Sequence, residues 1–185
     1  MKHHNEASDR YRRLAAAFTD VIESVPDDAW ANESPCAGWN VRDVLRHVAD
    51  SEREFMERMA FGPDVEASDD PVADWQRVNE AVQSALDDPA KAAHGYDGYF
   101  GPTTFAETVD TFYAGDLLVH GWDIAHGAGL EEFEQLDAAE MDDARRRLEP
   151  LGDAVRSPGV FGPPLDAGAD ASDQERFLAW AGRSV

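Results

Sequence analysis

The chain has 185 residues, of which 43% are hydrophobic, so it is long enough to bury a core without disulfides or structural metals. Its 38 acidic and 16 basic residues give a formal net charge of -22, which argues against binding to nucleic acids or to anionic membranes. Cys36 is the only cysteine, so no disulfide can form within the chain. A zinc site would therefore have to use nitrogen and oxygen ligands.

The hydropathy of the chain predicts a cytoplasmic protein. No stretch approaches the ~20 apolar residues that are needed to cross a bilayer. Residues 1–7 also lack the hydrophobic core of a signal peptide. We expect a single domain over residues 1–185 that has no membrane contact.

Apolar residues recur every three or four positions through most of the chain, which predicts amphipathic helices. In chain order, the expected helices cover residues 11–25, 40–59, 75–86, 104–127 and 137–148. Pro26 is expected to end the first helix, and Asn40 to cap the second with Asp43 three residues on.

The segments between and after the predicted helices indicate how these helices are connected. Glycine and aromatic residues between 90 and 103 indicate a link that can hold a short hairpin, and residues 150–185 indicate an extended tail with a short helix that Asp173 caps. Four long helices with a long crossover predict an all-α four-helix bundle with a short C-terminal extension. Metal sites in such bundles are commonly built from facing helices in the core.

The fourth predicted helix carries two polar residues on its apolar stripe. Asp116 and His120 are four residues apart, so they share the helix face of their apolar neighbours. Burying an unpaired carboxylate costs ~2 kcal/mol or more, so Asp116 must be protonated, ion-paired or bound to a cation. A hydrogen bond between Asp116 and His120 is the alternative, because the D-x-x-x-H pattern is short and common by chance.

A third candidate ligand lies on the second predicted helix, where His47 stands at the margin of the apolar face. Together with Asp116 and His120 it offers two imidazoles and one carboxylate from two helices. Such a set leaves coordination positions free, as in catalytic metal sites. Asp123, one turn beyond His120, is a candidate to orient a ligand imidazole or to act as general base, with a surface or capping role as the alternative.

For the remaining cysteine, tryptophan and histidine residues in these motifs, we expect structural rather than catalytic roles. Cys36 is expected to be a small packed residue, and Trp39 and Trp122 are expected to be core anchors. His126 follows His120 by six residues and so points to another side of the helix, which makes it a poor fourth ligand.

Two motifs resemble a known family. Residues 34–47, SPCAGWNVRDVLRH, resemble the PC-x-GW-x-V-x-D-L-x-x-H signature of the DinB-like metal-binding bundle of mycothiol-dependent maleylpyruvate isomerases. Residues 116–125, DLLVHGWDIA, resemble its second signature, and residues 159–164 and 177–183 extend the resemblance over nearly the whole chain. The resemblance implies a divalent metal held by His47, Asp116 and His120. Zinc is the first candidate for this metal, and nickel, manganese and iron are the others.

The resemblance also implies a reaction class and its partners. A metal with an open position can bind a low-molecular-weight thiol, mycothiol or a similar one, and present it to a small-molecule electrophile. The chain is then a thiol-dependent S-transferase or isomerase. Two alternatives stay open, which are a non-catalytic metal-binding or stress-response module and a metal-dependent hydrolase that uses bound water.

Overall fold

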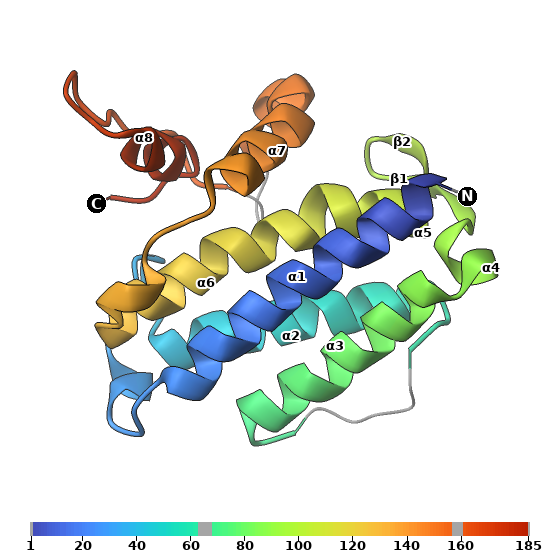
Figure 1. The fold of residues 1–185 in the computed structure, drawn as a ribbon, viewed down its shortest axis with the longest axis horizontal. Coiled ribbons are helices and arrows are strands. Elements are labelled where there is room, and N and C mark those ends of the chain that lie inside the picture. The colour runs from blue at the N-terminus through green and yellow to red at the C-terminus, as the bar shows by residue number, and fades with distance from the viewer. Residues whose placement is uncertain (1, 63–67, 157–160, 185) are drawn as a thin grey trace.

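Long helices packed side by side form the body of the protein (Figure 1). The computed structural model describes residues 2–62, 68–156 and 161–184. The bundle consists of α1 (Lys2–Ser24), α2 (Val41–Arg58), α3 (Pro71–Asp87) and α6 (Ala114–Ala128). Helix α1 packs against α3 and α6, and α2 packs against the same two helices. The prediction of an all-α bundle of the DinB-like type is confirmed.

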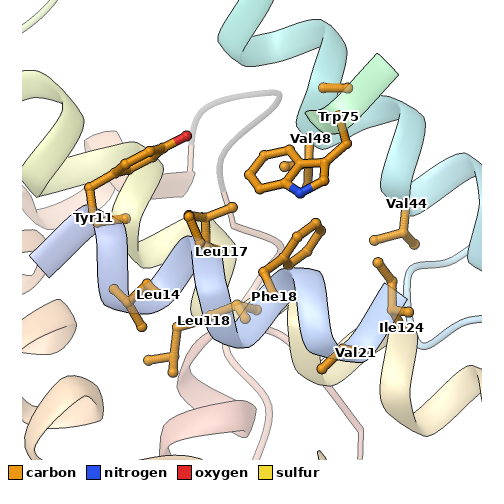
Figure 2. Close-up of a cluster of buried hydrophobic side chains, with 14 of the residues drawn as sticks. Tyr11, Leu14, Phe18, Val21, Val44, Val48, Trp75, Leu117, Leu118 and Ile124 are labelled. Atoms are coloured by element: carbon orange, nitrogen blue, oxygen red, sulfur yellow. The ribbon is translucent and has the colours of Figure 1, made fainter. Parts of the chain in front are cut away.

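Aromatic and aliphatic side chains from all four helices meet in the core, shown in Figure 2. Phe18 of α1 and Trp75 of α3 lie edge to face with ring centroids 4.8 Å apart. The indole nitrogen of Trp75 donates a hydrogen bond of 3.1 Å to the Thr19 hydroxyl. The largest buried ring therefore keeps its polar atom satisfied inside the core.

The helix ends follow the capping chemistry in the sequence, with two corrections. Asn40 and Asp43 form the expected capping box at the start of α2. The last helix, α8 (Asp173–Trp180), is capped by Ser172, so the prediction of Asp173 as the cap was wrong by one residue. Helix α1 begins at Lys2, well before the expected Tyr11, because no proline or glycine interrupts the preceding residues.

The predicted helix over residues 104–127 is not one continuous α-helix. It consists of α5 (Phe105–Thr108), a π-helical segment (Val109–Tyr113) and α6. A π turn holds more residues than an α turn, so it rotates the side chains before it relative to those after it. The predicted stripe is therefore split, and Asp116 is half-buried although Phe105 and Ile124 are fully buried.

The remaining elements flank the bundle. The expected hairpin is present, with β1 (Gly95–Gly98) and β2 (Gly101–Thr104) antiparallel and Gly95 opposite Thr104. The shorter helical pieces are η1 (Ala29–Ala31), α4 (Pro89–Ala92), η3 (Glu131–Phe133), α7 (Ala138–Leu148) and η4 (Glu149–Arg156). No helix in the described part of the chain is both long and apolar enough to cross a membrane.

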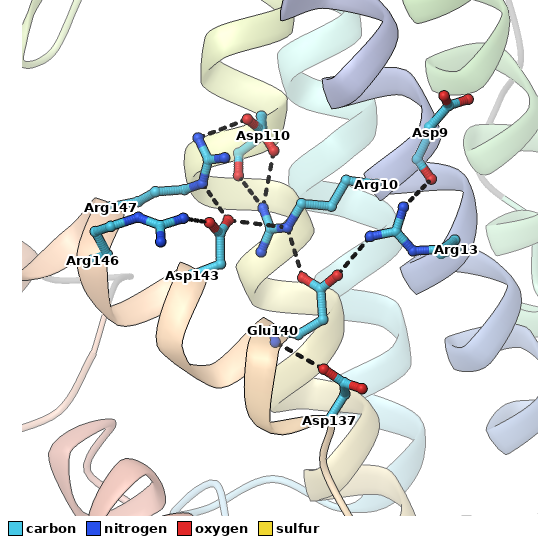
Figure 3. Close-up of polar contacts among 9 residues, drawn as sticks. All are labelled: Asp9, Arg10, Arg13, Asp110, Asp137, Glu140, Asp143, Arg146 and Arg147. Carbon is cyan, nitrogen blue, oxygen red and sulfur yellow. Dashed lines mark hydrogen bonds and ion pairs between the residues drawn. The ribbon is translucent and has the colours of Figure 1, made fainter.

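An ion-pair network fastens α7 to the bundle, as Figure 3 shows. The buried guanidinium of Arg10 on α1 contacts Asp110 of the π-helical segment at 3.0 Å. It also contacts Glu140 and Asp143 of α7 at 2.7 and 3.3 Å. One cation on α1 thus links three carboxylates from two other elements.

Candidate metal centre

Two histidines from facing helices meet between α2 and α6. The ring centroids of His47 and His120 are 5.2 Å apart, with an interplanar angle of 76°. His120 is 8% exposed, and His47 is half-buried. The helix packing therefore brings together two predicted ligands that are 73 positions apart in the sequence (120 − 47).

Trp39 lies beside this pair at the protein surface. Its ring centroid is 4.8 Å from that of His47, and the residue is 36% exposed. The prediction that Trp39 is a core anchor was wrong, because Trp39 lies in the loop before α2 and more than a third of the residue is exposed. Trp122 is buried as expected.

Asp116, the predicted carboxylate ligand, stands one turn before His120 on α6. It is half-buried, and no described residue donates a hydrogen bond to its side chain. Burial raises the pKa of Asp116, although the nearby charges of His120 and Arg183 act in the opposite direction. An oxygen without donors in a poorly solvated position is suited to bind a cation.

Asp123 holds the imidazole of His120. Its Oδ2 atom lies 2.9 Å from Nδ1 of His120, and the residue has no exposed surface. Nδ1 is thus occupied, and Nε2 is the nitrogen that remains for another ligand. The buried position of Asp123 excludes the surface role that the sequence left open.

Two further side chains complete the surroundings of Asp123. Arg183, which follows α8, donates from Nε to Oδ1 at 3.1 Å and from Nη2 to Oδ2 at 2.8 Å. The thiol of Cys36 donates to Oδ2 at 3.2 Å. Cys36 is half-buried, so its packing role includes this polar contact.

The electrostatics of the two imidazoles differ. Burial lowers the pKa of His47 to about 4, with the positive charge of His120 as the second cause. Burial also acts to lower the pKa of His120, but its hydrogen bonds with Asp123 and Cys36 and the charges of Asp123 and Asp116 outweigh burial and raise that pKa to about 10. Near neutral pH His47 thus offers a free lone pair, whereas a cation at His120 must displace a proton.

The ligand atoms of Cys36, His120 and Asp123 all lie within 4.8 Å of one another, and His47 and Asp116 do not belong to this group. The group is nevertheless a poor cation site, because the guanidinium of Arg183 already contacts Asp123 and lies 3.5 Å from the Cys36 sulfur. A second positive charge there would be repelled. Two imidazoles and one carboxylate, from His47, His120 and Asp116, are ligand types that suit a divalent cation, although these three residues do not form such a compact group among the described residues.

The sequence analysis missed two residues near the site. Arg183 lies in the segment 177–183 that carried part of the family resemblance, but nothing local assigned it a partner. Glu52 follows Val44 and Val48 at helical spacing on the buried face of α2, and this acidic residue in an apolar stripe was an available signal. Burial raises the pKa of Glu52 to about 8.

The fold and the site together define an all-α bundle protein with a candidate metal centre between its second and fourth long helices. Residues 11–125, more than half of the chain, match the family model of the mycothiol maleylpyruvate isomerase N-terminal domain. The chain belongs to this family. The matched region contains His47, Asp116, His120 and Asp123, whereas Arg183 lies beyond it.

Two similar proteins that match nearly the whole chain have names that describe no function. The chain is 24% identical over 182 residues to an uncharacterized protein of Mycobacterium tuberculosis strain CDC 1551 / Oshkosh, covering 95% of this chain and 96% of the relative. The same values hold for an uncharacterized protein of strain ATCC 25618 / H37Rv. No solved structure gives a significant match.

Proposed function

We propose that this protein binds a divalent cation, zinc in the first place, through His47, Asp116 and His120, and catalyses a thiol-dependent transfer or isomerisation. The observation that best supports this proposal is the arrangement of His120. Its Nδ1 atom is held by buried Asp123, and its ring lies edge to face against that of His47, with the centroids 5.2 Å apart. Histidine ligands of metals commonly have such a carboxylate behind them.

When bound, a divalent cation would lower the pKa of a coordinating thiol so that the thiolate forms at neutral pH. The remaining roles belong to the chain. His47 is neutral near pH 7 and presents a lone pair, and Asp123 fixes the orientation of His120. Arg183 in turn holds both carboxylate oxygens of Asp123.

Mycothiol is the thiol that we propose, because the family is that of the mycothiol maleylpyruvate isomerase N-terminal domain. The second substrate is a small electrophile. Attack of the thiolate on such a molecule gives an S-conjugate, and addition followed by elimination of the same thiol gives an isomer.

The test measures metal content and thiol chemistry in one preparation. We expect the purified protein to contain a divalent metal and to accelerate the reaction of mycothiol with monochlorobimane more than that of glutathione or cysteine. His120→Ala should lose both the metal and the rate enhancement. His126→Ala is the matched control, because His126 is an exposed histidine of the same helix that pairs with Glu134 at 3.2 Å.

Two outcomes would contradict the proposal. A protein that retains the metal but consumes no thiol above the His120→Ala level would be a binding module. Turnover of hydrolysable substrates without any thiol would instead indicate a hydrolase.

A further inference from the structure

Arg183 reaches the candidate metal centre from a segment that lies outside the bundle of long helices. It follows α8, which packs against α7 at the side of the bundle (Figure 1). Its side chain is nevertheless buried, with 9% exposed, and it pairs with Asp123 of α6, whose side chain has no exposed surface. The C-terminal segment thus contributes directly to the surroundings of the candidate ligand His120.

The contact between Arg183 and Asp123 has two points. Nε of the guanidinium donates to Oδ1 at 3.1 Å, and Nη2 donates to Oδ2 at 2.8 Å. Two hydrogen bonds from one planar guanidinium fix the plane of a carboxylate, whereas a single bond leaves the carboxylate free to turn. Oδ2 is also the atom that lies 2.9 Å from Nδ1 of His120. The direction of the His120 ring therefore depends on a carboxylate whose own orientation Arg183 sets.

Arg183 is itself held by neighbours in the C-terminal segment. Its Nη1 atom donates a hydrogen bond of 2.7 Å to the carbonyl oxygen of Ala181. Its guanidinium carbon lies 6.0 Å from the centre of the Phe161 ring, at the limit of a cation–π contact. All three nitrogens of the guanidinium thus have acceptors, and its plane is fixed.

The backbone before Arg183 makes a close approach that favours glycine. Gly182 has a positive φ of 81°, and a Cβ atom there would lie 3.2 Å from backbone atoms of residues 162–163. A larger residue would be strained at this φ and would push the two segments apart. The turn at Gly182 therefore places the guanidinium against Asp123.

Stability alone is a weak reason for this arrangement. Replacing a buried ion pair by apolar side chains of similar volume is often neutral or stabilising, because the attraction between the charges is offset by the cost of removing both from water. Arg183 and Asp123 form such a buried pair. What apolar side chains would not supply is the fixed orientation of the His120 imidazole.

We infer that Arg183 is a positioning residue of the candidate metal centre, and that it acts through Asp123 on the direction in which Nε2 of His120 points. The C-terminal segment then completes the site, although it lies outside residues 11–125, which match the family. Residues that support metal ligands from behind affect metal affinity without contacting the metal. The inference rests on the proposed function, because it treats His120 as a metal ligand.

The test compares Co²⁺ binding by variants of the full chain. Arg183→Lys keeps a positive charge beside Asp123 but lacks the planar pair of donors. Its Co²⁺ affinity should fall about 10- to 100-fold, and its visible absorption should change because the His120 ring turns. Arg176→Lys is the matched control, because Arg176 lies on α8 and forms an exposed pair with Asp173. Its affinity and absorption should equal those of the wild type.

Thermal unfolding in the presence of a chelator separates positioning from stability. Arg183→Lys should lower the melting temperature less than Arg183→Met, which leaves the buried charge of Asp123 without a partner. A pair with a structural role alone would lower the melting temperature in both variants and leave the Co²⁺ affinity and absorption of the folded protein unchanged.

A second variant decides if Arg183→Lys does not fold. Gly182→Ala keeps both charges but displaces the backbone next to Arg183. Gly168→Ala is its matched control, because Gly168 has a similar φ of 82° and no described atom lies within 4 Å of a Cβ placed there. Only Gly182→Ala should weaken Co²⁺ binding.

The outcomes distinguish this inference from the proposed function. If Arg183→Lys, or Gly182→Ala in its place, binds Co²⁺ like the wild type while His47→Ala and His120→Ala do not bind it, only the inference is overturned. A wild-type protein that takes up no Co²⁺ overturns both.

Discussion

Both carboxylate oxygens of Asp123, near the candidate metal centre, have hydrogen-bond partners. Its two oxygens accept hydrogen bonds from Arg183 and Cys36 and contact the His120 ring. Burial acts to raise the pKa of Asp123, but His120 and Arg183 lower it to about 2. The carboxylate is therefore charged at neutral pH and compensates the buried Arg183.

We expect Asp123→Asn to affect both metal binding and folding. The amide leaves Arg183 without its counter-charge, which should lower the free energy of unfolding by about 3–5 kcal/mol. The weaker support of His120 should lower the metal affinity about 10- to 100-fold. Urea denaturation and Co²⁺ titration measure the two effects, with Asp142→Asn on the exposed side of α7 as control. Unchanged metal affinity in Asp123→Asn would refute the orienting role.

The raised pKa of Glu52 predicts that the free energy of unfolding of the chelator-treated protein depends on pH. Its folded pKa of about 8 lies above the ordinary value of 4.5, so the folded state keeps a proton that the unfolded state releases between these values. The stability that this group contributes is complete below pH 4.5 and is lost as the pH rises toward 8. Between pH 5 and pH 7 the loss should amount to about 3 kcal/mol.

The comparison with Glu52→Gln isolates this effect. Glutamine does not titrate, so the difference in unfolding free energy between variant and wild type should grow from pH 5 to pH 7. His120, whose folded pKa is about 10, loses its own contribution above pH 6.5 in both proteins and cancels in the difference. A difference that is constant with pH would show that Glu52 is ionised in the core.

At the scale of elements, both ion pairs and apolar packing hold α7 to the bundle. Arg10 on α1 connects it to the π-helical segment through Asp110, Glu140 and Asp143 (Figure 3). The apolar residues of α7 that face the core are Met141, Ala144 and Leu148. The ion pairs of Arg10 add to this apolar contact.

Arg10→Leu should therefore destabilise the protein and loosen α7. Its removal leaves Asp110, Glu140 and Asp143 with only their pairs to the more exposed Arg13, Arg146 and Arg147. We therefore expect a loss of about 1–3 kcal/mol in the free energy of unfolding. Arg12→Leu, which breaks only exposed pairs with Asp9 and Asp87, should cost less than about 1 kcal/mol. Urea denaturation and hydrogen exchange in α7 provide the measurements. Equal losses for both variants would contradict the structural role of Arg10.

Comparison of the predicted and observed helices shows which features the local sequence pattern predicts. The period of apolar residues places α2, α3 and α7 within a few residues of their observed bounds, because amphipathic spacing and caps are local properties. The π turn at Val109–Tyr113 was not predicted. Residues 109–113 contain neither proline nor glycine, so the sequence holds no local breaker that would indicate a departure from the α-helix there.

At the scale of the whole molecule, the net charge of -22 produces repulsion that opposes the compact state. We expect the melting temperature to rise when NaCl is increased from about 10 mM to about 0.5 M, because salt shortens the screening length. Calorimetry at constant pH measures the shift, and sodium sulfate at equal ionic strength serves as comparison. A fall in melting temperature would mean that the screened ion pairs, such as those of Arg10, outweigh the general repulsion.

The sequence by itself determined the helical class, most helix bounds, the family motifs and the candidate ligands His47, Asp116 and His120. Each of these depends on periodicity or spacing along one segment. The tertiary structure decided which side chains meet. It placed Arg183 on Asp123 across 60 residues and Tyr11 on Glu52 across 41, and it left Trp39 at the surface. Such contacts arise from the packing of distant segments, which residue spacing along the chain does not record.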